Sequence, residues 1–262
     1  MPVCTLHPRC PPRWPVEWLI ALLAVFLTGC ASLRPGHDAG DLNRSAWAQD
    51  NRLPLASAGP GWVHQTVGNR APSTYTPTNH RGRPAIRARS DKGDSLIRIA
   101  LPLPGAQAGR LQFSWFVEAL NAEADLQDRE RDDAVVRLIL QFDGDRAPWS
   151  ARDQRVSEWV QLATGEPLPH ATLMYVWDPS RPVGTVLKHP RTDRIRLLVI
   201  ESGPRRLGQW VDFERDVRAD YEKVFGKAPR GLVGIGLMTD ANNTRQASEA
   251  WYGPLRWVAP AN

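Results

Sequence analysis

Residues 133–142 read D-A-V-V-R-L-I-L-Q-F, and this stretch decides the fold class. Every second residue is apolar, and in a β-strand successive side chains point to opposite faces. The other face carries Asp133 and Arg137 among apolar neighbours. The stretch therefore predicts a strand that turns one face to a hydrophobic core. The residues on that core face are Ala134, Val136, Leu138, Leu140 and Phe142.

Short runs of the same kind recur from Trp62 onward, bounded by Gly, Pro, Asp or Asn and rich in β-branched and aromatic residues, which is typical of strands. Only 216–225 and 152–163 have helical spacing. Strands with one or two inserted short helices predict an all-β fold, an antiparallel two-sheet β-sandwich of the jelly-roll type. The predicted strands are Ala85–Ser90, Leu96–Leu101, Leu111–Glu118, Ala134–Phe142, Thr172–Trp177, Ile195–Glu201, Gln209–Phe213, Leu232–Met238 and Ala250–Val258.

The N-terminus has the pattern of an export signal. Arg9 and Arg13 precede an apolar run, residues 18–26, that is too short to span a bilayer comfortably. The next four residues, Leu27-Thr28-Gly29-Cys30, resemble the bacterial lipobox, whose cysteine is lipidated and becomes the mature N-terminus. The resemblance implies a lipoprotein attached to the membrane through Cys30. Ala31 after the cysteine implies the outer membrane of a bacterial envelope, facing the periplasm. The alternative is an ordinary signal peptide, or an uncleaved anchor, that happens to contain a cysteine.

Three segments follow from this pattern: residues 1–29 as a lipoprotein signal peptide, 30–60 as a flexible tether, and 61–262 as a single β-sandwich domain. All cysteines lie at positions 4, 10 and 30, so the exported part has no thiol for a disulfide or a soft metal. Lys and Arg number 33 against 28 Asp and Glu, and these charges are dispersed without a basic block. With the exported location, this argues against a nucleic-acid partner.

Polar clusters stand at the ends of several predicted strands, where a sandwich gathers its loops. The stretch 240–244 reads D-A-N-N-T and follows a strand that contains Gly234 and Gly236, at which another group could approach closely. The plainer interpretation is a loop whose Asx side chains cap their own backbone, with ion pairs around Arg137 or Arg215. The candidate ligand-binding residues are Asp240, Asn242, Asn243, Thr244, Trp251, Tyr252, Arg137, Asp133, Asp178 and Arg215.

No cofactor is predicted, and no metal site has a recognisable pattern. Asp143-Gly144-Asp145 resembles part of a loop for Ca²⁺, a hard cation that prefers oxygen ligands, but Asp-Gly is above all a turn signal. The sequence contains 11 Trp, and aromatic rings can stack on sugar faces. Trp115 and Trp177 stand in stretches that alternate with other apolar residues, which predicts core positions for them. Trp149 and Trp251 lie nearest to predicted loops.

Catalytic motifs are not evident. No histidine pair has metal-ligand spacing, and no Gly-x-Ser-x-Gly elbow or Walker loop occurs. Paired carboxylates for glycoside hydrolysis meet in space rather than in sequence, so they stay open as an alternative. The carboxylates considered for this role are Asp132, Asp133, Asp178, Asp216, Glu214 and Asp240.

Several motifs together resemble domain-of-unknown-function family 3047, over about Trp62 to Trp257. They are residues 131–138, R-D-D-A-V-V-R-L; residues 173–178, L-M-Y-V-W-D; residues 215–221, R-D-V-R-A-D-Y; and the stretch from Leu237 to Gly253. The family pattern Met-Thr-Asp-x-Asp-Asn-Thr has a second acid where this chain has Asn242. A divalent ion bound there would therefore have one negatively charged ligand fewer. The last third of the chain is also similar to the ends of galactose-binding-like sandwich domains.

These observations predict a lipid-anchored envelope protein whose sandwich binds a ligand, with a glycan as the leading class. One alternative is a hydrolase or lyase that acts on polysaccharide with paired carboxylates. The other is a non-enzymatic assembly protein with an envelope protein as its partner.

Overall fold

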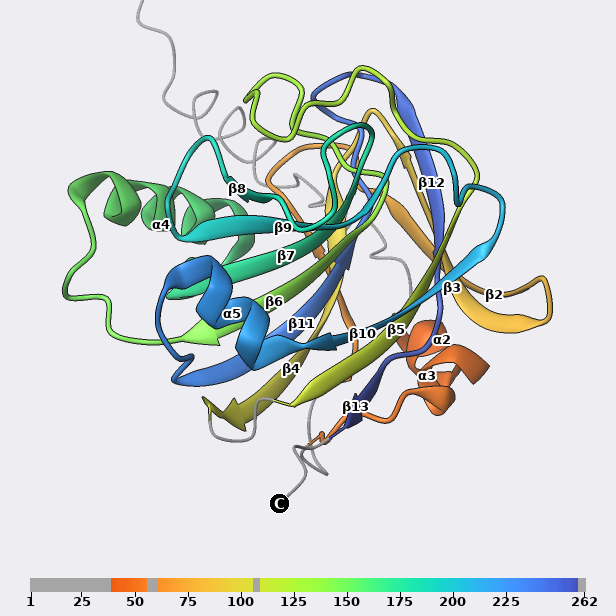
Figure 1. Ribbon diagram of the computed structural model, residues 1–262, viewed down its shortest axis with the longest axis horizontal. Coiled ribbons are helices and arrows are strands. Elements are labelled where there is room, and N and C mark those ends of the chain that lie inside the picture. Colours follow the sequence, from red (N-terminus) through yellow and green to blue (C-terminus); the bar gives the residue numbers. More distant parts are fainter. Residues whose placement is uncertain (1–38, 56–60, 106–108, 259–262) are drawn as a thin grey trace, which may run out of the picture. The chain divides into compact units, whose positions relative to one another are not determined.

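The computed structural model describes residues 39–55, 61–105 and 109–258, and its main feature is two curled β-sheets (Figure 1). Its helices are α2 (Ala39–Arg44), α3 (Ala46–Asp50), α4 (Ala151–Thr164) and α5 (Val217–Phe225). Its strands are β1 (Val63–Thr66), β2 (Thr74–His80), β3 (Arg83–Asp91), β4 (Ser95–Pro104), β5 (Arg110–Val117), β6 (Arg137–Asp143), β7 (Ala171–Asp178), β8 (Val186–Lys188), β9 (Ile195–Ser202), β10 (Trp210–Asp216), β11 (Gly231–Met238), β12 (Ala247–Tyr252) and β13 (Arg256–Val258).

The strands form a seven-stranded sheet in the order β1-β4-β11-β6-β7-β9-β8 and a six-stranded sheet in the order β10-β5-β12-β3-β2, with β13 paired to β5. The prediction of a β-sandwich is confirmed. One pair departs from the antiparallel prediction, because β7 and β9 run parallel. Parallel neighbours need a long crossover. Here residues 179–194, which include β8, lead from the end of β7 back to the level at which β7 begins, so that β9 can run parallel to it.

The hydrophobic core lies between the two sheets and follows the period of two that the sequence predicts. Leu138 and Leu140 of β6 are fully buried in the same cluster as Trp115 of β5. The segment 134–136 differs, because β6 begins only at Arg137. The backbone of Ala134 instead bonds with Asp240, which draws this segment out of the regular ladder.

The two predicted helices are present. In α5, Asp216 caps the N-terminus by accepting from the amide of Ala219, and Gly226 ends the helix with a positive φ of 73°. The helical spacing of residues 152–163 predicts that one side of α4 is apolar and buried. This prediction is wrong at Trp159, which is 53% exposed. The helix is held through polar side chains, with Asp153 accepting from the Thr192 hydroxyl at 2.5 Å.

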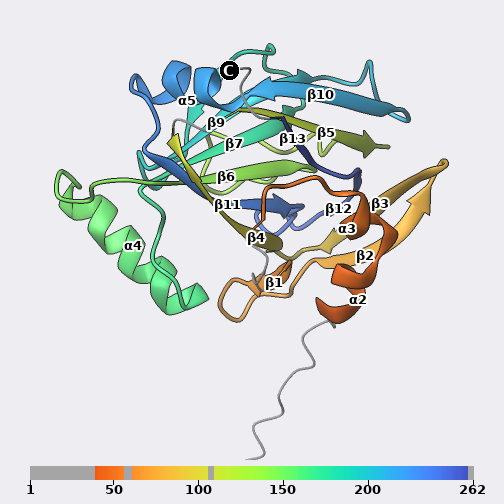
Figure 2. The same cartoon turned by 90° about the horizontal axis from the view of Figure 1, so that it is seen from below.

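The tether predicted for residues 30–60 differs from the structure between Ala39 and Leu55. Here α2 and α3 pack beside β2 and β3 (Figures 1 and 2). The side chain of Trp47 is only 1% exposed and packs against Trp62, with the ring centroids 4.9 Å apart. The amide of Arg52 also donates to the carbonyl of Leu255. This segment therefore belongs to the folded unit, because buried aromatic surface holds it there.

Strands β1, β2 and β8 were not predicted. Each lies at a sheet edge, and β2 alternates poorly and contains a proline, as edge strands can. The predicted signal peptide and the predicted lipidation site, Cys30, lie outside the described residues. Within the described ranges, no helix has the length and apolar character that crossing a bilayer requires.

Candidate functional site

Arg137 stands at the centre of a buried cluster of charges. Its side chain is 3% exposed and joins two carboxylates. Nε and one terminal nitrogen each donate at 3.1 Å to an oxygen of Asp240, and the same terminal nitrogen donates to Asp132 at 3.0 Å. The second oxygen of Asp132 lies 3.2 Å from Nε2 of His189. The cluster thus links the end of β11 to the start of β6.

Burial dominates the electrostatics of this cluster. It raises the pKa of Asp240 to about 7, although Arg137 opposes that shift. Burial disfavours the charge on Arg137, but the two carboxylates outweigh it and raise the pKa of the guanidinium above its ordinary value. For Asp132, burial is outweighed by Arg137 and His189, which lower the pKa. The proton of the cluster therefore resides most readily on Asp240.

The stability of the protein should consequently depend on pH through Asp240. An unfolded aspartate has a pKa of about 4, so the folded state binds this proton more tightly. A raised pKa gives a contribution that is full below the unfolded value and lost as the pH rises through the folded value. Relative to Asp240→Asn, we expect the wild type to lose about 1 kcal/mol per pH unit between pH 5 and 7. Urea unfolding of both proteins across this range measures the difference, and a constant or growing difference would contradict the assignment.

The polar stretch 240–244, predicted to bind a ligand, forms hydrogen bonds within itself and with the segment before β6. Asp133 accepts from the amide of Asn243 at 3.1 Å and from both the amide and the hydroxyl of Thr244 at 2.6 Å. Asn243 donates to the carbonyl of Arg129, and Asn242 donates to Asn243. These polar groups are engaged with each other, so the arrangement braces two loops.

Of the remaining predicted residues, Tyr252 reaches the cluster and the other three lie elsewhere. The hydroxyl of Tyr252 reaches the cluster from the six-stranded sheet and donates to the carbonyl of Met238 at 2.6 Å. Asp178 is fully buried and pairs with Arg181. Arg215 pairs with Asp220 beside α5. Trp251 lies on the same six-stranded sheet as Tyr252, in β12, but faces away from the core. The structure thus brings together only the residues around Arg137.

An aromatic cluster covers part of the outer face of the six-stranded sheet. His80 stacks on Trp251 with ring centroids 4.1 Å apart, and both rings contact Phe116. Trp210 packs edge-on against Phe116 and donates its indole N–H to the carbonyl of His80. The guanidinium of Arg83 lies over the Trp210 ring, 5.3 Å from its centroid. Trp210 is only partly buried, so the cluster reaches the surface.

A hollow of about 510 Å³ adjoins this cluster on the same outer face. In β10, Val211 points into the core, so Asp212 and its alternate neighbours point outward. Asp212 pairs with Arg83 at 2.6 Å, which links the hollow to the aromatic cluster. The side chains that give the hollow its chemistry are Asp50, Arg83, Gln112, Ser114, Asp212, Glu214 and Arg256.

Three of these side chains are available to a ligand. Asp50 of α3 and Arg256 of β13 make no side-chain hydrogen bond or ion pair with any other described residue, and neither does the hydroxyl of Ser114. Gly253 lies against that hydroxyl, since a Cβ there would come within 2.1 Å of it. The floor is therefore open and lined by unoccupied donors and acceptors.

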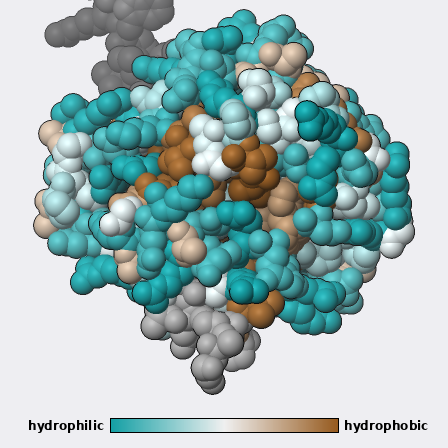
Figure 3. Space-filling model, viewed as in Figure 1, coloured by the Kyte–Doolittle hydropathy of each residue, from teal (hydrophilic) through white to brown (hydrophobic). Residues whose placement is uncertain are grey.

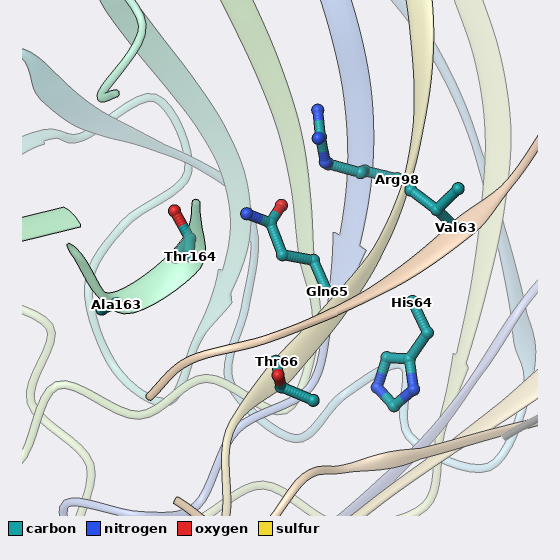
Figure 4. A pocket seen from close by; sticks show the side chains of 7 residues that line it. All are labelled: Val63, His64, Gln65, Thr66, Arg98, Ala163 and Thr164. Carbon is teal, nitrogen blue, oxygen red and sulfur yellow. The ribbon is translucent and has the colours of Figure 1, made fainter. Parts of the chain in front are cut away.

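A second, smaller hollow of about 290 Å³ lies between β1 and the C-terminal end of α4. Figure 4 shows Gln65, Thr164 and Arg98 around it, with Gln65 directed toward the helix end. Its single cation is neutralised, because Arg98 is paired with Glu166. This hollow offers fewer unoccupied polar groups and no neighbouring aromatic cluster.

Exposed apolar side chains form only small patches on the described surface. Figure 3 shows one face that is mostly hydrophilic, with apolar side chains gathered near its middle, around β8 and β9. Val183 and Val186 are 59% and 37% exposed, and Leu162 of α4 is 88% exposed. These spots are candidates for contact with another protein, but each is narrow.

Among the residues with described placement, no group of three or more His, Cys, Asp or Glu side chains is placed to hold a metal ion. Asp143 accepts from the amide of Gly144, and Asp145 accepts from the amide of Ala147, as in a turn. Binding of Ca²⁺ stays a prediction.

Fold and hollow together define a β-sandwich protein with an open, ligand-sized depression on the outer face of one sheet. The chain belongs to the family described as "Protein of unknown function (DUF3047)", whose model matches residues 60–256. The resemblance seen in the sequence is thereby confirmed.

Several solved structures are distantly similar to this chain. A family 11 carbohydrate-binding module from Clostridium thermocellum, in complex with a mixed-linked tetrasaccharide, is 9% identical, with 75% of this chain and 88% of that chain covered and a TM-score of 0.38. The xyloglucanase domain of NopAA from Sinorhizobium fredii is 9% identical over 79% and 96%, with a TM-score of 0.42. The endo-1,4-β-glucanase CelB2 is 11% identical over 76% and 93%, with a TM-score of 0.40. No curated protein matches the chain.

Most residues of the larger hollow were missed from the sequence. Glu214 was named only as one of several carboxylates, and Asp50 was placed in a tether. A signal was available in β10, where Trp210, Asp212 and Glu214 alternate with Val211 and Phe213. Such alternation marks an outward face that carries an aromatic ring and two carboxylates.

Proposed function

We propose that the protein binds a glycan in the hollow on the outer face of the six-stranded sheet. The observation that carries the proposal is the set of unoccupied polar groups, Asp50, Ser114 and Arg256, beside an aromatic cluster that reaches the surface at Trp210. A binding site of this kind needs few, well-placed polar groups in a concavity of several hundred Å³.

The chemistry of these groups suits a sugar. Carboxylates accept from sugar hydroxyls, and a guanidinium donates to them in a fixed, planar geometry. An indole ring offers an apolar face to the C–H side of a sugar ring at little cost in conformational entropy. A site with both signs of charge favours a neutral or zwitterionic glycan over a polyanion.

The arrangement supports binding more than hydrolysis. Asp212 and Glu214 are alternate residues of one strand and lie on the same face, but each is already engaged. Hydrogen bonds from Gln112, and then from Arg110, lower the pKa of Glu214. A general acid for glycoside cleavage needs a raised pKa.

Loss of the Trp210 ring should weaken glycan binding. For Trp210→Ala we expect an affinity about fivefold lower, because stacking of an aromatic ring contributes on the order of 1 kcal/mol. Isothermal titration of the full chain with neutral and acidic oligosaccharides, including cello-oligosaccharides and peptidoglycan fragments, measures this. Trp159→Ala is the matched control, since that ring is exposed on α4, outside the hollow. Equal affinity in both variants, or no binding by the wild type, would overturn the proposal.

We also propose that Cys30 anchors the mature protein to the outer membrane. The support is the sequence Leu27-Thr28-Gly29-Cys30 directly after an apolar run. We expect palmitate labelling and membrane fractionation of the wild type, and neither after Cys30→Ser. Cys10→Ser, which changes a cysteine before the apolar run, should behave as the wild type. Labelling that persists without Cys30 would contradict lipidation at this residue.

A further inference from the structure

Helix α4 carries apolar side chains on the side that faces solvent. Trp159 is 53% exposed and Leu162 is 88% exposed, and residues three positions apart lie next to each other on one side of a helix. Arg155, one turn before Trp159, is also exposed, and its side chain makes no hydrogen bond or ion pair with another described residue. We call these three outward side chains the α4 patch.

The buried residues on the inner side of α4 are polar. They are Asp153 and Ser157. Asp153 accepts from the Thr192 hydroxyl at 2.5 Å, and the Ser157 hydroxyl accepts from the amide of Leu168 at 3.2 Å. A helix on the surface of a globular protein ordinarily turns its apolar side inward. In α4 the buried positions are polar and the most exposed ones are apolar, so packing against the sandwich does not account for the α4 patch.

The α4 patch lies toward the end of the helix that is joined to α2 through β1. The carbonyl of Ala163 accepts from the amide of Gly68, two residues after β1. At the other end of β1, Trp62 exchanges two hydrogen bonds with the side chain of Asn43 in α2. One strand of four residues thus separates α2 from this end of α4. Figure 2 shows α2, β1 and one end of α4 on the same side of the sandwich.

The proposed attachment at Cys30 would keep this side of the sandwich close to a bilayer, and the inference rests on that attachment. The helix α2 begins at Ala39. A chain spans at most about 3.5 Å per residue, so the link from Cys30 to α2 reaches roughly 30 Å at most. The strand β1 adds roughly 13 Å. A bilayer that holds a lipid on Cys30 is therefore within reach of the α4 patch.

We propose that the α4 patch docks on the lipid surface to which the chain is anchored. Trp and Leu side chains of a helix that lies along a membrane enter the boundary between headgroups and acyl chains. An Arg beside them meets the negative charge of anionic lipids. The helix α4 lies along the surface in this arrangement and does not cross it. Docking would restrict how the anchored sandwich turns relative to the membrane.

The small size of the α4 patch favours a bilayer over a second protein. A stable protein interface needs about 20–30 residues on each side, and the α4 patch has only three side chains. Two apolar side chains also bind a bilayer weakly by themselves. An anchor that already holds the chain at the surface raises the effective concentration to about the millimolar range, in which weak contacts form.

The chain from Ala31 onward tests the docking, because it keeps every described residue and contains no cysteine. A hexahistidine tag at its N-terminus holds it on vesicles with a nickel-chelating lipid, in phosphatidylcholine alone or with added phosphatidylglycerol. Gln161→Cys places a fluorescent label beside the α4 patch. Lipids with a nitroxide at the headgroup quench the label only where it lies at the bilayer. Glu222→Cys carries the control label on α5, on the opposite side from α2 in Figure 2.

We expect strong quenching of the label at position 161 and weak quenching at position 222. Leu162→Ala should lower the ratio of docked to free molecules about tenfold, because its contact with the acyl chains is lost. Arg155→Gln should lower the ratio about fivefold, and only on vesicles with phosphatidylglycerol. Arg205→Gln is the matched control for charge, because Arg205 is exposed and makes no ion pair with another described residue.

Equal quenching at both label positions, or quenching at position 161 that survives Trp159→Ala combined with Leu162→Ala, would overturn the proposal. Self-quenching that grows with protein density, without quenching by lipid, would also overturn it, since it would reveal contact between copies. The changed side chains are exposed, and thermal unfolding verifies that each variant is folded. A chelated metal replaces the lipid on Cys30 in this experiment, so a failure of lipidation leaves the result unchanged.

Discussion

Replacement of Asp240 by alanine is expected to lower the free energy of unfolding by about 3–5 kcal/mol at about pH 8.5, where the carboxyl of Asp240 is ionised. The change leaves Arg137, with 3% of its side chain exposed, short of one of its two counter-charges. It also leaves the amide of Ala134 without its acceptor. Removal of one partner of a buried ion pair costs this much because the other charge stays buried and uncompensated. Urea unfolding measures the loss.

The matched control is Glu222→Ala. Glu222 pairs with Arg218 on the surface of α5 at 2.9 Å, one helical turn apart. An exposed pair of this kind contributes only about 0.3–0.5 kcal/mol. If Asp240→Ala cost no more than Glu222→Ala, the buried cluster would not brace the fold.

The second large effect is expected at Trp47. Its ring is 1% exposed in the cluster between the two sheets. Truncation to alanine removes this contact and leaves a cavity, so Trp47→Ala should lower the free energy of unfolding by about 3–5 kcal/mol. The same assay measures it.

Trp159→Ala provides the comparison, because that tryptophan is 53% exposed on α4. We expect a change within about 0.5 kcal/mol there. Equal small effects at both positions would mean that residues 39–55 are a tether after all. Trp47→Phe should fall between the two results, because it retains part of the buried surface.

The sandwich could be predicted because alternation reports burial directly. Where each second residue is apolar, as in β6, one face must meet the core, and the strand is correctly placed from Arg137 onward. The predicted start of this strand was wrong where polar side chains, rather than a neighbouring strand, bond to the backbone. Residues 134–136 bond to Asp240 and the Thr239 hydroxyl instead of a neighbouring strand, and these partners lie about 100 positions later in the sequence.

Of the candidate ligand-binding residues, Arg137 and Asp240 pair with each other in the structure, and their role in binding a ligand stays a prediction. Their burial could not be predicted, since a sequence does not show which loops fold over one another. The larger hollow was missed for the same reason. Asp50, Ser114, Asp212 and Arg256 come from four separate elements, α3, β5, β10 and β13, that are far apart in the sequence and meet only in the folded chain. Alternation in β10 indicated an outward polar face, but it did not indicate a depression beside it.

The position of α2 and α3 affects how a soluble form of this protein should be made. The family match begins at residue 60, which invites truncation just before Gly61. The folded unit nevertheless includes α2 and α3, with the buried ring of Trp47. A chain that starts at Gly61 would expose the apolar surface that Trp47 covers, beside Trp62, and would lose the wall of the hollow that Asp50 supplies. Such a product would tend to self-associate, and its failure to bind sugar would reflect the choice of first residue rather than the protein.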